Sequence, residues 1–199
     1  GADGNDFASL PPQLGVSPEL AVRYVFPHAP VIPVTINMGT PMPAWYDITS
    51  LDARGQDEAG IRQSAASIEM LIAREIDRGV PASRIVLAGF SQGAAMALFT
   101  GLRCESPLAG LVVLSGYLPL HERLPKEAAE SNQQVPILQA HGRHDDVVPR
   151  QLGYGSAELL RAAGYQVEWH EYEMAHEVCF EEVQEIGRWL NRVFGEESN

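Results

Sequence analysis

The chain has 199 residues, a formal net charge of −12 and only two cysteines. This length suits one domain, and the surplus of acidic side chains would repel nucleic acid and anionic membranes, so neither is expected as a partner. Cys104 and Cys179 lack C-x-x-C spacing, which excludes a disulfide framework and argues against a zinc ribbon. No apolar run is long enough to span a bilayer, so stable membrane insertion is not expected, and two free thiols indicate a reducing, cytoplasmic location.

The first part of the chain is predicted to contain a strand, a long loop and a helix. Residues 22–26 form a short apolar run ended by Pro27, which predicts a strand. Residues 28–56 show no periodicity and are rich in proline, which is typical of a functional or mobile loop. Apolar residues then recur at helical spacing over 61–76, with acidic residues before them and Gly79 after them.

The rest of the chain alternates between apolar runs and amphipathic stretches. Strands are predicted at 84–88, 111–114, 137–140 and 167–172, and helices at 94–99, 149–163 and 183–193. Near-continuous apolar strands separated by helices indicate a mostly parallel sheet with helices on both faces. Because no linker or repeat interrupts the pattern, we expect one α/β domain over 1–199.

The segment Gly89-Phe90-Ser91-Gln92-Gly93 has the form G-x-S-x-G between a predicted strand and a predicted helix. A serine on such a sharp turn has strained backbone angles and needs small neighbours, which the two glycines supply. The context therefore predicts a nucleophile elbow with Ser91 as nucleophile.

A serine nucleophile needs a base, and the base needs a carboxylate that holds its tautomer. In parallel α/β sheets such groups gather in loops after the strands. The loop after 137–140 offers Asp145, and the loop after 167–172 offers His176, in the chain order expected for this fold. Asp146 is the alternative acid, whereas His170 lies within a strand and is interpreted as a packed or surface side chain.

The same loop contains a cluster that could suggest a metal site, formed by His141, His144, Asp145 and Asp146. Its spacing lacks a paired-histidine motif with a defined third ligand. A solvated turn explains it better, so no metal and no cofactor are expected.

The chain resembles the bacterial carboxylesterases of the acyl-protein thioesterase (phospholipase/carboxylesterase) family of α/β-hydrolases, over essentially its whole length. The resemblance is carried by GADGNDF at 1–7, FPHAP at 26–30, AWYDI at 44–48, GFSQGA at 89–94, LSGYLP at 114–119, HGRHD at 141–145 and MAH at 174–176. It implies the α/β-hydrolase fold without a large lid domain, Ser91 as nucleophile, Asp145 as acid and His176 as base. It also implies the main-chain amide of Gln92 as an oxyanion donor, and the family suggests a homodimer.

One departure concerns the start of the sequence. Family members have a strand that ends in His-Gly-Leu-Gly-Ala-Asp, and this chain begins at the second of those glycines. The missing leucine would donate the second oxyanion amide. We therefore expect the authentic protein to extend upstream of Gly1, with N-terminal strands and this second donor in the extension.

The expected reaction is hydrolysis of short- to medium-chain carboxylic esters through an acyl-enzyme, with a small-molecule ester or thioester as substrate. The resemblance leaves acyl-protein thioesterase or lysophospholipase activity as the alternative. A dienelactone-hydrolase-like enzyme would have Cys at Ser91, and a non-catalytic binding module would have lost a triad member. Met38, Met42 and Trp45 lie in the long loop and could wall an acyl groove or pack as a rigid loop.

Overall fold

Four parallel strands form the centre of the structure, a computed structural model that describes residues 2–50 and 55–195. The strands are β3 (Val86–Phe90), β4 (Gly110–Leu114), β5 (Ile137–Gly142) and β6 (Val167–Tyr172), and they lie in this order across the sheet. In register, Val86 lies opposite Gly110, Leu111 opposite Ile137, and Ile137 opposite Val167. β4 and β5 are buried along their whole length, which explains why β4 is a continuous apolar run and β5 begins with one.

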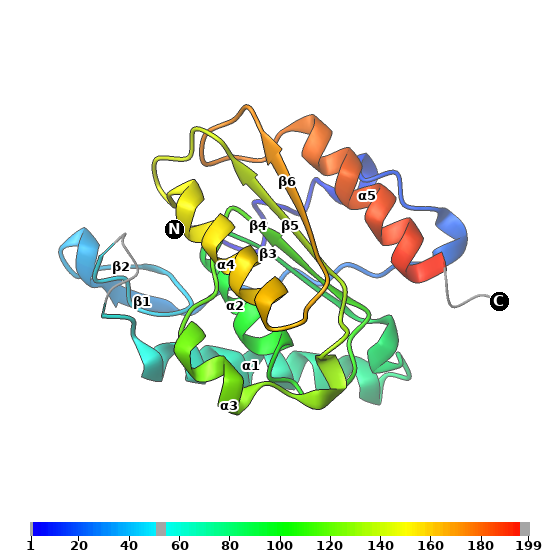
Figure 1. The fold of residues 1–199 in the computed structure, drawn as a ribbon, viewed down its shortest axis with the longest axis horizontal. Coiled ribbons are helices and arrows are strands. Elements are labelled where there is room, and N and C mark those ends of the chain that lie inside the picture. Colours follow the sequence, from blue (N-terminus) through cyan, green and yellow to red (C-terminus); the bar gives the residue numbers. More distant parts are fainter. Residues whose placement is uncertain (1, 51–54, 196–199) are drawn as a thin grey trace.

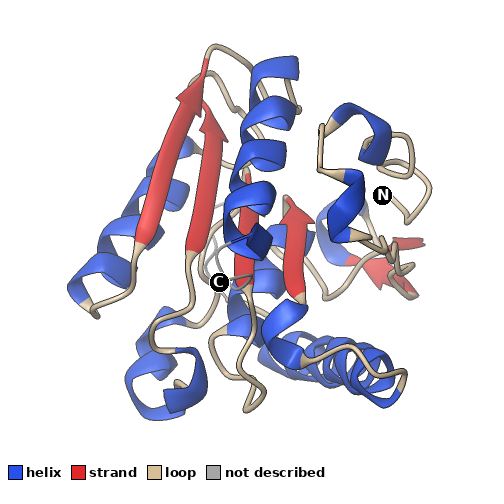
Figure 2. Cartoon of the chain, turned by 90° about the vertical axis from the view of Figure 1, so that its right-hand side faces the viewer, coloured by secondary structure: helices blue, strands red, loops and turns tan. Residues whose placement is uncertain are grey.

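Helices cover both faces of this sheet, as Figures 1 and 2 show. They are α1 (Glu58–Asp77), α2 (Gln92–Gly101), α3 (Leu124–Glu127), α4 (Arg150–Ala162) and α5 (Phe180–Gly195). On one face, Ile72 of α1, Leu98 of α2 and Leu160 of α4 belong to a single buried cluster with the sheet. On the other face, Trp189 and the other apolar residues of α5 form a second cluster. The α/β class and the covered parallel sheet are as predicted.

The helix predicted over 61–76 is α1, and its ends follow the expected chemistry. Asp57 is its N-cap, and the side chain accepts a 2.9 Å hydrogen bond from the Gly60 N–H. The chain leaves the helix through Gly79, which has φ of 97° and so adopts a conformation that favours glycine. Among the described residues, no helix is both long enough and apolar enough to cross a lipid bilayer.

The strand predicted at 22–26 is wrong, because this segment has no regular secondary structure and joins neither sheet of the described chain. Val22 and Tyr24 pack against the second cluster, the one that contains Trp189 of α5. The apolar pattern of this segment therefore reflects packing on the core. Its backbone has no strand beside it within the described residues, and β-structure requires a hydrogen-bonded neighbour.

The long loop predicted over 28–56 contains an antiparallel hairpin that sequence analysis missed. β1 (Val31–Val34) pairs with β2 (Thr40–Pro43), and the 3₁₀ turn Thr35–Asn37 joins them. Pro33 lies opposite Pro41 in the register, which hides the strand signal because proline cannot donate to the ladder. A two-stranded ribbon tolerates these prolines because both strands are edges. The hairpin stands apart from the central sheet at the left of Figure 1.

Candidate active site

Ser91 lies at the carboxyl end of β3, where the chain turns sharply into α2. Its φ of 56° and ψ of −118° are strained for a residue with a side chain. A Cβ added at Gly89 would lie 2.1 Å from the Gly93 carbonyl oxygen, so the turn requires glycine at 89. A Cβ at Gly93 would meet no atom within 4 Å outside its own helix, so the expectation that both glycines must lack a side chain for space is wrong for Gly93.

The loops after β5 and β6 bring Asp145 and His176 to this serine. The Nε2 atom of His176 lies 2.9 Å from the Ser91 Oγ, and its Nδ1 lies 2.7 Å from Oδ2 of Asp145. An ionised carboxylate only accepts hydrogen bonds, so Nδ1 carries the proton and Nε2 is free to accept one from the serine hydroxyl. The three side chains chosen from the sequence thus form one hydrogen-bonded chain, and the exposed Asp146 takes no part in it.

The turn that carries Asp145 is built to hold its carboxylate. Oδ1 accepts main-chain hydrogen bonds from Val147 at 3.0 Å and from Val148 at 2.8 Å, which leaves Oδ2 for the histidine. His141, fully buried, places its Nε2 2.9 Å from the Val148 carbonyl oxygen and 3.4 Å from Oδ2 of Asp145. Burial lowers the pKa of His141, so it stays neutral and donates from Nε2 to the carbonyl.

The ring of His176 is further fixed by an aromatic neighbour. Its centroid lies 4.7 Å from that of Phe90, the residue before the serine, and the Phe90 ring in turn lies 5.6 Å from the ring of Phe7. Sequence analysis singled out neither the phenylalanine contact nor the role of His141 in the turn. The only sequence signal was position, because both residues lie close to Ser91 or Asp145.

Gln92, the predicted oxyanion donor, is the first residue of α2. The first N–H groups of an α-helix have no acceptor within the helix, so they can face a ligand. The predicted second donor would precede Gly1 and therefore lies outside the described residues.

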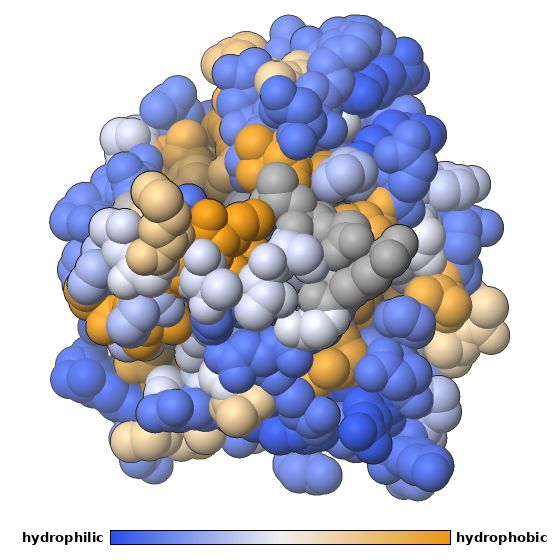
Figure 3. Space-filling model, turned by 90° about the vertical axis from the view of Figure 1, so that its left-hand side faces the viewer, coloured by the Kyte–Doolittle hydropathy of each residue, from blue (hydrophilic) through white to orange (hydrophobic). Residues whose placement is uncertain are grey.

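The three residues predicted to line a substrate pocket lie in different surroundings. Met38, at the turn of the hairpin, is 96% exposed. Met42 is half-buried on β2, where the Asn37 amide contacts its sulfur at 3.0 Å, and Trp45 packs on the cluster between α1 and α2. Figure 3 shows the face of the molecule that lies at the left of Figure 1, where the hairpin is. Apolar surface on this face forms separate patches among polar residues. A shared acyl-binding role for the three stays a prediction.

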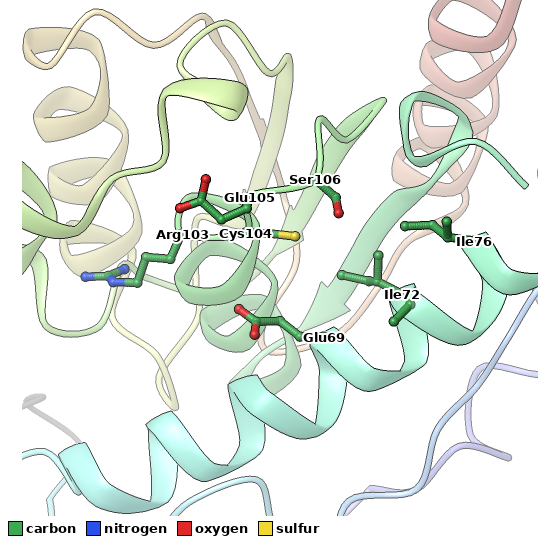
Figure 4. Close-up of a pocket in the computed structure, with 8 residues that line it drawn as sticks. Glu69, Ile72, Ile76, Arg103, Cys104, Glu105 and Ser106 are labelled. Carbon is green, nitrogen blue, oxygen red and sulfur yellow. The ribbon is translucent and has the colours of Figure 1, made fainter.

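A cavity of about 210 Å³ lies away from Ser91, between α1 and the segment that follows α2 (Figure 4). Ile72 and Ile76 line one side, and residues 103–106 line the other. This segment leads into the amino end of β4, whereas Ser91 lies at the carboxyl end of β3. Cys104 in its wall is buried, and burial raises its thiol pKa, which keeps it in the unreactive protonated form.

The four residues that suggested a metal site do not converge: His141 and Asp145 are buried and in contact, whereas His144 and Asp146 are exposed. His144 is exposed and lies 2.8 Å from a Glu173 oxygen, away from the buried His141. Within the described ranges, one group of three ligand-type side chains has its ligand atoms within 4.8 Å of one another, formed by Glu168, His170 and Glu185. Arg188 and Arg192 of α5 pair with Glu185 and Glu168, so this group is part of an ion-pair network between β6 and α5.

Glu182, in the first turn of α5, is a buried carboxyl group that the sequence analysis did not identify. It is 1% exposed, and no hydrogen-bond donor among the described residues reaches either oxygen. Burial raises its pKa to about 8, so it is protonated at neutral pH. The loop that carries His176 leads directly into this turn.

The chain matches a known protein family. A family model described as phospholipase/carboxylesterase matches residues 1–194. Acyl-protein thioesterase 1 of Neurospora crassa is 46% identical over 180 residues, which cover 85% of this chain and 73% of that protein. Acyl-protein thioesterase 1 of Emericella nidulans is 39% identical over 189 residues, which cover 89% and 79%.

Solved structures agree with these matches. SOBER1 of Arabidopsis thaliana superimposes with a TM-score of 0.91 at 29% identity, covering 97% of this chain and 94% of that one. Acyl-protein thioesterase 2 of Zea mays gives a TM-score of 0.80 at 29% identity, covering 98% and 90%. The two sequence relatives are fungal, so the restriction to bacterial carboxylesterases is not supported. The chain belongs to the phospholipase/carboxylesterase family of α/β-hydrolases and is a hydrolase.

Proposed function

We propose that this hydrolase is an acyl-protein thioesterase, which cleaves the thioester between a fatty acyl group and a protein cysteine. The observation that carries the proposal is the hydrogen-bonded chain from the Ser91 Oγ through His176 to Asp145. Sequence relatives named acyl-protein thioesterase 1, at 39–46% identity, favour the thioester over the simple carboxylic ester as substrate. Sequence analysis had put these two substrates in the opposite order.

The reaction follows from the positions of these atoms. The Ser91 Oγ attacks the acyl carbon while its proton moves to Nε2 of His176, and the resulting oxyanion accepts from the Gln92 main-chain N–H. The tetrahedral intermediate collapses, the C–S bond breaks, and the leaving sulfur takes the proton from His176. Asp145 stabilises the imidazolium through Nδ1 during both proton transfers.

The second half of the reaction frees the enzyme. His176 removes a proton from water as the water oxygen attacks the acyl carbon, and the acyl–Oγ bond then breaks. The serine oxygen regains its proton from Nε2, and the products are a free thiol and a fatty acid. No cofactor takes part in any step.

Matched peptides test the substrate class. Two peptides of one sequence should be compared, one with an octanoyl thioester on cysteine and one with an octanoyl oxygen ester on serine. We expect the wild type to hydrolyse the thioester with the higher kcat/KM. A clear preference for the oxygen ester would return the assignment to carboxylesterase.

Two serine variants test the chemistry with the same peptides. Ser91→Ala should lose activity by a factor on the order of 10³ or more, because no nucleophile remains. Ser67→Ala, an exposed position on α1, is the matched control and should behave as wild type. Substantial turnover by Ser91→Ala would overturn the mechanism itself.

A further inference from the structure

The side chain of Gln92 joins the nucleophile turn to the segment after the hairpin. Its Oε1 accepts a 2.7 Å hydrogen bond from the Trp45 N–H, and its Nε2 donates a 2.8 Å hydrogen bond to the Tyr46 carbonyl oxygen. One carboxamide therefore satisfies a donor and an acceptor of two consecutive residues. An oxyanion donor needs only a main-chain N–H, so the role proposed above does not require glutamine at this position.

The segment to which the Gln92 side chain is hydrogen-bonded, residues 45–47, is fixed by further contacts. Ser64 of α1 donates to the Trp45 carbonyl oxygen, and the N-cap Asp57 accepts a 3.0 Å bond from the Asp47 N–H. Tyr46 is 4% exposed, and its hydroxyl lies 3.2 Å from that of Tyr117. These contacts make residues 45–47 a fixed block, to which the glutamine anchors the start of α2.

The anchor is placed where the backbone is strained. Ser91 has a positive φ of 56°, a strained conformation for a residue with a side chain, which persists only where its surroundings enforce it. The Ser91 N–H donates to the Leu114 carbonyl at 2.8 Å. The two side-chain hydrogen bonds of Gln92 restrain Gln92 itself, whose N–H is part of the 91–92 peptide.

We infer that Gln92 is a positioning residue: its carboxamide locks the 91–92 peptide against residues 45–46 and so aims the oxyanion amide. This inference rests on the proposed function, because it assumes acyl transfer at Ser91. It predicts that loss of the carboxamide lowers the rate of the chemical step even for a substrate too small to contact the hairpin. The effect should therefore appear in kcat for an acetyl thioester, with little change in KM.

The test compares Gln92→Met with Ser64→Ala on an acetyl thioester. Methionine keeps most of the side-chain volume and the main-chain amide but loses both hydrogen bonds. Ser64→Ala removes a hydrogen bond to the same Trp45 residue without touching the nucleophile turn. We expect Gln92→Met to lower kcat by about tenfold with KM changed less than about twofold, and Ser64→Ala to lower kcat by less than about threefold.

Three controls make the result decisive. Thermal unfolding of both variants separates loss of folded protein from loss of rate, and Gln92→Ala replaces the methionine variant if that one does not fold. Equal kcat values for the Gln92 and Ser64 variants, or an effect confined to KM, would overturn the positioning role. Ser91→Ala in the same series tests the proposed function separately, because full activity there would refute Ser91 chemistry whatever Gln92 does.

Discussion

Replacing Glu182 with glutamine should stabilise the protein at alkaline pH and leave its stability near pH 4 almost unchanged. The carboxyl group is 1% exposed and has no hydrogen-bond donor near it among the described residues, so its charged form is poorly solvated. Burial raises its pKa from 4.5 to about 8 in the folded protein. Glutamine has nearly the same shape and does not ionise.

The sign and size of the stability change caused by Glu182 follow from the linkage between proton binding and folding. The folded-state pKa lies above the unfolded one, so this group's contribution to stability is full below about pH 4.5 and is lost as the pH rises to about 8. The difference between 8 and 4.5 is about 3.5 pH units. At about 1.4 kcal/mol per unit, the loss reaches at most about 5 kcal/mol.

Urea unfolding followed by tryptophan fluorescence, at pH 5, 6.5, 8 and 9, measures this loss. The advantage of Glu182→Gln over wild type should grow by up to about 1.4 kcal/mol per pH unit and level off above pH 8. Glu181→Gln, the exposed neighbouring position, is the control and should show no such growth. Parallel stability curves for wild type and Glu182→Gln would refute the reasoning, because the carboxyl would then be ionised or solvated in the folded state.

Four further substitutions test other parts of the site and fold. Asp145→Asn should lower kcat by a factor on the order of 10³–10⁴ with little effect on folding, since the amide no longer fixes the histidine tautomer; steady-state kinetics and circular dichroism check this. Gly89→Ala should cost about 1–3 kcal/mol in urea unfolding because its Cβ would strike the Gly93 carbonyl, whereas Gly93→Ala should be tolerated, and equal losses would contradict the geometry. Asp57→Ala removes an N-cap and should cost about 1 kcal/mol, measured by thermal unfolding; an unchanged Tm would count against the cap.

The parts of the fold that sequence analysis predicted are those with strong local patterns. The buried strand β4 is an apolar run and β5 begins with apolar residues, and α1 has apolar residues at regular helical spacing between an acidic cap and Gly79. The predicted strand at 22–26 failed because apolar residues report burial but not the presence of a neighbouring strand. The hairpin was missed because proline opposite proline removes the usual β signal.

In the candidate site too, residues marked by a local motif or by the fold class could be predicted, whereas contacts between distant segments could not. Ser91, Asp145 and His176 could be chosen because the fold class assigns such groups to loops after particular strands. The hydrogen bonds from the Gln92 side chain to residues 45–46 join segments more than 40 residues apart, so no local sequence pattern predicts them. Glu182 could have been found, because it lies four residues before Ile186 on the apolar face of α5.

Covalent trapping tests the central claim most directly. The protein should be incubated with a fluorophosphonate, which adds irreversibly to an activated serine, and its intact mass and peptide map then measured alongside remaining thioesterase activity. We expect one adduct per chain, on Ser91, with activity lost in proportion to labelling. An adduct on another residue, or full activity after Ser91 is modified, would contradict that claim.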